Sequence, residues 1–162
     1  MSLEIDLIGY QFPEVENEAW VSDWLMVRLT LRCGEWEWSK VDPALTTFEV
    51  QSCIDWLNEV ADIIGTFARW KNFNRLSTRE FFTEPNLGFE VFSGHPTGLP
   101  ATFRIYFWAE FLPADPRTFG LQNVQPGELE PWIDFGVDES KLRQIVESFR
   151  EQLESYPVRV GL

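Results

Sequence analysis

Few residues of this chain could carry out chemistry. The sequence has one histidine, His95, and two cysteines, Cys33 and Cys53. A zinc site usually needs three or four His or Cys ligands, and a catalytic histidine needs a nucleophile or an acid beside it in a pocket. His95 stands between Gly94 and Pro96, in a predicted surface loop, without an evident nucleophile. No Walker motif or GxGxxG loop is present. The sequence therefore predicts no metal site, no catalytic residue and no cofactor.

One pair of carboxylates could still do chemistry. Glu35 and Glu37 alternate along a predicted strand, so their side chains share one face about 7 Å apart. Two carboxylates at that spacing can hold Mg²⁺ or act as acid and base. Exposed acids on a solvent-facing strand produce the same pattern without any activity. A carboxylate-dependent hydrolase is therefore one hypothesis about function, behind two kinds of binding protein.

The charge of the chain favours a binding protein. Its 162 residues carry 13 Lys and Arg against 26 Asp and Glu, a net charge of −13. Residues 1–62 hold 13 acidic and 3 basic side chains, a net charge of −10. Nucleic acids and anionic membranes are not expected as partners, because phosphate contacts need Lys and Arg. The acids serve either solubility or the binding of a basic protein.

The length of the chain, and the absence of signal-peptide and membrane-spanning patterns from its sequence, predict a single cytoplasmic domain. No signal-peptide pattern and no apolar run long enough to span a bilayer is present. Two cysteines are too few for a disulfide framework, and we expect both to be buried and reduced. The length fits one domain over residues 1–162, and the sequence leaves the oligomeric state open.

The order of predicted elements indicates the fold class. Alternating polarity predicts strands, and a period of 3.6 residues predicts helices. Strands are expected at 3–8, 24–33, 35–41, 76–84, 87–92, 102–112 and 132–137, and helices at about 47–64 and 139–155. Short connections favour antiparallel pairing. We therefore predict an α+β fold: a curved, mostly antiparallel β-sheet of six to eight strands, with two α-helices packed against it.

Local signals mark the ends of these elements. Thr46 and Glu49 have the spacing of a capping box, which starts the first helix. Asp138 is the expected N-cap of the second helix. Asp42-Pro43 is expected to end the strand that precedes the first helix.

Tryptophans raise a second binding hypothesis. Trp36 and Trp38 are two residues apart and share one face of a predicted strand, and Trp56 lies on a predicted helix. Such a stripe is typical of a core, whereas exposed tryptophans are typical of binding interfaces. A small adaptor or ligand-binding domain, with an aromatic pocket lined by these residues, is the alternative function.

Several short segments occur in the order found in one family of small bacterial proteins. They are Asp23-Trp24-Leu25-x-Val27, Trp38, Asp42-Pro43-Ala44-Leu45-Thr46-Thr47-Phe48-Glu49-Val50, Trp56-Leu57, Glu84-Pro85-Asn86-Leu87-x-Phe89-Glu90 and Arg104-Ile105-Tyr106-Phe107. Through them, over about residues 5–156, the sequence resembles the WapI family of immunity proteins. Ala44 stands where a cysteine is expected.

The resemblance implies a function and explains the charge. It implies a non-catalytic immunity protein that binds and neutralises the toxin domain of a contact-dependent, wall-associated polymorphic toxin. Such toxins are often nucleases with basic clefts, which an acidic protein can occupy. We expect the acids of residues 14–62 to cluster on one exposed surface, formed by the loop at 13–23, the outer side of the strand with Glu35 and Glu37, and the outer face of the first helix. The predicted partner-binding residues are Glu14, Glu16, Glu18, Trp20, Asp23, Trp24, Glu35 and Glu37.

Overall fold

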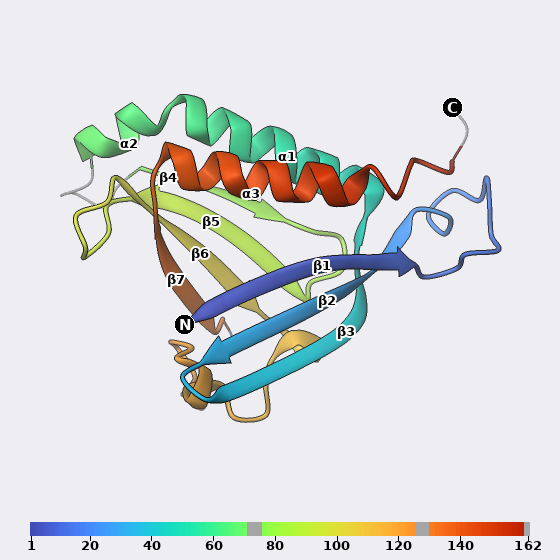
Figure 1. Cartoon of the computed structure of the whole chain (residues 1–162), viewed down its shortest axis with the longest axis horizontal. Coiled ribbons are helices and arrows are strands. Elements are labelled where there is room, and N and C mark those ends of the chain that lie inside the picture. Colours follow the sequence, from blue (N-terminus) through green and yellow to red (C-terminus); the bar gives the residue numbers. More distant parts are fainter. Residues whose placement is uncertain (71–75, 126–129, 161–162) are drawn as a thin grey trace.

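Two antiparallel sheets and three helices make up the fold (Figure 1). The computed structural model describes residues 1–70, 76–125 and 130–160. The first sheet has the order β1-β2-β3 and the second β4-β5-β6-β7. The strands are β1 (Ser2–Tyr10), β2 (Trp24–Cys33), β3 (Trp36–Thr46), β4 (Ser77–Phe81), β5 (Leu87–Ser93), β6 (Ala101–Phe107) and β7 (Trp132–Val137). The helices are α1 (Thr47–Asp62), α2 (Ile64–Trp70) and α3 (Glu139–Leu153).

The predicted α+β class is confirmed, but the single curved sheet is wrong. β1 pairs only with β2, and the free edge of β1 is bound by a side chain instead of a strand. The Leu7 N–H donates to Oε1 of Gln152 at 2.7 Å, and Nε2 of Gln152 donates to the Ile5 carbonyl at 3.2 Å. The side-chain amide of Gln152, on α3, thus forms the hydrogen bonds with the β1 backbone that a neighbouring strand would otherwise form. The seven strands therefore divide into two sheets.

Several predicted boundaries differ from the structure, and the strand predicted at 76–84 is β4, which ends at Phe81. The strand expected to end at Asp42-Pro43 continues to Thr46, because β3 lies at a sheet edge and its pairing with β2 shifts register next to Pro43. Edge strands and such irregularities are the places where a strand accepts proline. The strand predicted to reach residue 112 ends at Phe107, since Ala109 has a φ of 46° and starts a 3-10 turn. The helical segment after Ile63 forms α2, a third helix that we did not predict.

Both sheets and the helices share one apolar core. α1 and α3 lie side by side and run in opposite directions over the second sheet (Figure 1). Arg143 on α3 joins them through Asn58 and Asp62 of α1. The core residues of these elements include Val50, Ile54, Leu57, Phe89, Val91, Phe103, Ile105, Leu142, Val146 and Phe149.

The predicted capping box is present and gives a stability prediction. The Glu49 N–H donates to Oγ1 of Thr46 at 3.2 Å, and the Thr46 N–H donates to Oε2 of Glu49 at 2.8 Å. Thr46→Ala should lower the free energy of unfolding by about 1 kcal/mol, because an N-terminal amide of α1 loses its acceptor. Urea denaturation measures the loss. Thr66→Ala, at an exposed site on α2, is the matched control, and equal midpoints for the two variants would contradict the prediction.

The two cysteines are free but differ in exposure. Cys53 is buried, as expected, whereas Cys33 is only half-buried at the end of β2. Burial raises the pKa of the Cys53 thiol, and the charge of Glu80 raises it further. Because the thiolate is the reactive form, a thiol reagent should label Cys33 in the native protein much faster than Cys53. Mass spectrometry of the two cysteine-containing peptides over time measures both rates, and equal rates would refute this prediction.

Candidate functional site

An acidic loop, residues 11–23 between β1 and β2, projects from one end of the molecule (Figure 1). Local hydrogen bonds give it a defined shape. The Glu18 N–H donates to Oγ of the buried Ser22 at 2.8 Å, and the Ser22 N–H donates back to the Glu18 carbonyl at 3.0 Å. Its exposed acids are the predicted Glu14, Glu16 and Glu18.

Trp20 is the most prominent side chain of the acidic loop. It is 84% exposed, and its φ is 69°. A bulky side chain with this φ costs of order 1–3 kcal/mol and persists only where surrounding contacts impose it. One such contact is the Trp24 indole N–H, which donates to the Trp20 carbonyl at 2.7 Å. The acidic loop therefore exposes a large aromatic ring to solvent.

Asp23 anchors the acidic loop to the C-terminal segment. Its side chain is buried, with 4% of the residue exposed. The carboxylate accepts hydrogen bonds from the N–H groups of Arg159 at 2.7 Å and Val160 at 3.3 Å. Asp23 therefore positions the loop and is not itself available to a partner.

Arg159 is a positioning residue that sequence reasoning missed. Its guanidinium donates to the carbonyls of Phe12 at 3.2 Å and Pro13 at 2.8 Å, and lies 4.3 Å from the centre of the Tyr10 ring. The Arg159 carbonyl accepts from the Asn17 N–H at 3.2 Å. No local pattern marks this arginine, because its partners lie more than 130 residues away along the chain.

The anchor at Asp23 gives a third prediction. Asp23→Ala should lower the free energy of unfolding by about 1–3 kcal/mol, because the N–H groups of Arg159 and Val160, both half-buried, lose their charged acceptor. It should also speed cleavage of the acidic loop in limited proteolysis. Glu14→Ala, in the same loop but exposed, is the matched control for both measurements. A Tm and a cleavage rate equal to those of Glu14→Ala would show that the anchor contributes nothing.

The other predicted partner-binding residues, Glu35 and Glu37, lie at the end of β2 that is farther from the acidic loop. Glu35 is in the turn between β2 and β3, and Glu37 is on the outer sheet face, where Nε of Arg32 donates to it at 2.6 Å. Arg32 also contacts Glu4 at 2.6 Å, which lowers the pKa of Glu4. β2 has ten residues at about 3.4 Å each, so this turn lies roughly 30 Å from the acidic loop. The structure does not bring the two acidic groups together.

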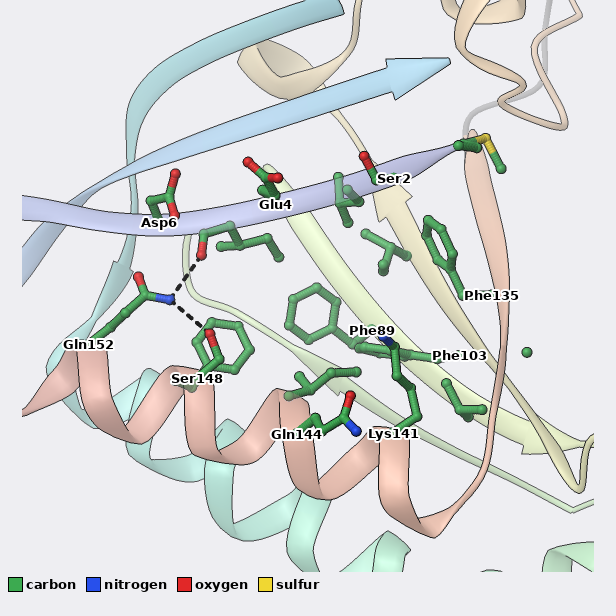
Figure 2. Close-up of a pocket in the computed structure, with 18 residues that line it drawn as sticks. Ser2, Glu4, Asp6, Phe89, Phe103, Phe135, Lys141, Gln144, Ser148 and Gln152 are labelled. Atoms are coloured by element: carbon green, nitrogen blue, oxygen red, sulfur yellow. Dashed lines mark hydrogen bonds between the residues drawn. The ribbon is translucent and has the colours of Figure 1, made fainter. Parts of the chain in front are cut away.

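The tryptophans do not form the predicted aromatic pocket. Trp36 is 64% exposed beside the turn, so its predicted place in the core is wrong, while Trp38 and Trp56 are half-buried against the core. The indole N–H of Trp56 donates to Oγ1 of Thr78 at 3.0 Å. None of the three lines the cavity of about 480 Å³ that lies between β1, α3 and the second sheet (Figure 2).

Metal-ligating side chains do not gather in one place within the part of the chain that the structure describes. In residues 1–70, 76–125 and 130–160, no group of three or more His, Cys, Asp or Glu could hold a metal ion. His95 lies in a loop, where its Nδ1 is 2.7 Å from Oγ1 of Thr97. No helix within the same ranges is long and apolar enough to cross a membrane.

Comparison with known proteins assigns the family. No curated protein matches the chain. The model of the WapI-like immunity protein family matches residues 1–157, which include both sheets, all three helices and the acidic loop. The chain therefore belongs to the WapI-like immunity protein family, which indicates a toxin-neutralising role.

Proposed function

We propose that this protein neutralises a cognate toxin domain by binding it, without catalysis, through the acidic loop. The observation that carries the proposal is the Trp20 ring, which is 84% exposed in a loop that also carries three exposed glutamates. A large exposed aromatic ring is a typical energetic centre of an interface. The protein acts in the cytoplasm, and its partner is a basic toxin domain, a nuclease, with no nucleic acid or membrane bound by the immunity protein itself.

The acidic loop is favoured over the turn at Glu35 and Glu37. A standard interface buries about 800 Å² on each partner, a patch roughly 30 Å across. The two acidic groups are separated by about that length along β2, so one toxin domain cannot be centred on both. Glu37 is paired with Arg32 at 2.6 Å. In the loop, Glu16 is only 3.9 Å from Arg159, and Glu14 and Glu18 have no ion pair within the described structure. The loop therefore offers the less compensated negative charge.

Within the loop, the predicted residues have two roles. Glu14, Glu16 and Glu18 steer a basic partner, and Trp20 makes the central apolar contact. Asp23 and Trp24 keep Trp20 in place through their hydrogen bonds with the C-terminal segment and the Trp20 carbonyl.

Growth protection tests the function. The C-terminal domain of a wall-associated toxin encoded beside this chain is expressed in a bacterial host, with or without this protein. Among cells that express the toxin domain, we expect growth only where this protein is also present, and we expect the two purified proteins to elute as one complex. Continued toxicity in the presence of the folded protein, with no complex on the column, would refute the proposal for that toxin.

Association kinetics test the surface. Glu16→Lys should slow association by about threefold or more at low ionic strength and leave dissociation nearly unchanged, because rim charges act on encounter. The wild-type association rate should fall steeply as salt rises. Glu37→Lys tests whether the turn at the opposite end of β2 takes part in binding, and Glu147→Lys on α3 is the control. Equal changes in all three variants, or no dependence on salt, would assign the acidic loop to solubility alone.

A further inference from the structure

The cavity of about 480 Å³ has three walls of different chemistry (Figure 2). One wall is β1, the second is the inner face of β5, β6 and β7, and the third is α3. Its depth is apolar, with buried Phe89, Phe103 and Ile105. The volume lies within the range of about 300–1,000 Å³ that is typical of sites for small organic molecules.

A polar stripe of α3 faces this apolar wall. Lys141, Gln144, Ser148 and Gln152 follow one another at spacings of three or four residues, so they lie along one face of the helix. Gln152 is bound to the edge of β1, and Nε2 of Gln152 also contacts Oγ of Ser148 at 3.4 Å. The other end of the stripe carries Lys141, the one basic side chain among the residues that line the cavity.

The charges at the cavity are arranged for an anion, although the protein is strongly acidic. Lys141 extends from α3 toward Phe103, whereas the carboxylates of Glu4 and Asp6 point away from the cavity, to the outer side of β1 (Figure 2). Glu4 is neutralised there by Arg32 at 2.6 Å. Lys141 takes part in no ion pair within the described structure.

We propose that this cavity binds an amphipathic monocarboxylate with one apolar chain, of the size of decanoate. The carboxylate pairs with Lys141 at the mouth, and the chain packs against Phe89, Phe103 and Ile105. An extended peptide fits less well, because adding a strand to β1 would displace both hydrogen bonds of Gln152. The proposal rests on none of the residues assigned to toxin binding, so either can fail without the other.

Calorimetric titration with straight-chain carboxylates, at concentrations below micelle formation, tests the apolar part. From hexanoate to decanoate, affinity should rise about fourfold for each added methylene, because each buries further apolar surface. Ile145→Trp, which places a large ring in the lining, should abolish binding while the far-UV circular dichroism stays unchanged. No binding of decanoate to the wild type, or full binding to folded Ile145→Trp, would overturn the proposal.

Replacement of Lys141 tests the polar part. Lys141→Gln should weaken decanoate binding about tenfold and leave decanol binding unchanged, because only the carboxylate loses a charged partner. Arg117→Gln removes the same charge from an exposed site outside the lining and should change neither affinity. Equal losses of decanoate binding in both variants, or tighter binding of decylammonium than of decanoate, would overturn the assignment of an anion site.

Discussion

Trp20→Ala should weaken binding of the toxin domain by about thirtyfold or more, mainly through faster dissociation. Central aromatic anchors typically contribute at least about 2 kcal/mol to binding, and such losses are usually found in the dissociation rate. The ring is 84% exposed in the free protein, so its removal breaks no core contact. Surface plasmon resonance with immobilised toxin domain measures both rates, and thermal denaturation confirms that the variant is folded.

Trp36→Ala is the matched control for this experiment. It removes an equally large ring, 64% exposed, from the opposite end of β2. We expect it to change the affinity by less than about threefold. If Trp36→Ala lost the larger share of affinity, the interface would be centred on the turn between β2 and β3, and the acidic loop would be ruled out as its centre.

Phe89→Ala should lower the free energy of unfolding by about 3–5 kcal/mol, the largest loss of stability that we predict. Phe89 is 0% exposed on β5, and its ring centre lies 5.2 Å from that of Phe82 and 5.3 Å from that of Phe103. Truncation removes these edge-to-face contacts and leaves an unfilled volume. For a chain of this length, the Tm should fall by about 6–20 °C.

Phe48→Ala is the corresponding control on α1, where the side chain is 49% exposed. It should cost less than about 1 kcal/mol, because little apolar surface returns to water. Calorimetry of both variants and the wild type should also give one cooperative transition, in line with our proposal that residues 1–162 form a single domain. Similar losses for Phe48→Ala and Phe89→Ala would contradict the burial on which the prediction depends.

Local sequence patterns predicted much of the secondary structure. β2 spans Trp24–Cys33, the predicted range, because strict alternation of apolar and polar residues fits a strand with one buried face. The starts of α1 and α3 agree with the predicted caps at Thr46 and Asp138, since a capping side chain bonds an amide only two or three residues away. Such contacts lie within the segment itself, so the sequence specifies them.

The proposed partner surface was predictable only in part. The acids and Trp20 could be found from charge and composition, and their exposure agrees with that interpretation. The sequence could not show whether one surface carries both acidic groups, Glu14, Glu16 and Glu18 in the loop and Glu35 and Glu37 near the turn. It depended on the path of β2, whose length separates the two groups.

By itself, the sequence determined the strands, the two main helices, the acidic balance and, through its resemblance, the family. Only the tertiary structure decided the division into two sheets, the exposure of Trp36 and the anchoring of the acidic loop. These features depend on contacts such as those of Leu7 with Gln152 and Asp23 with Arg159, which join residues 145 and 136 positions apart. A periodic pattern shows which face of an element is buried. It does not specify which distant group forms hydrogen bonds with a free strand edge or a buried carboxylate, because that depends on how the elements pack.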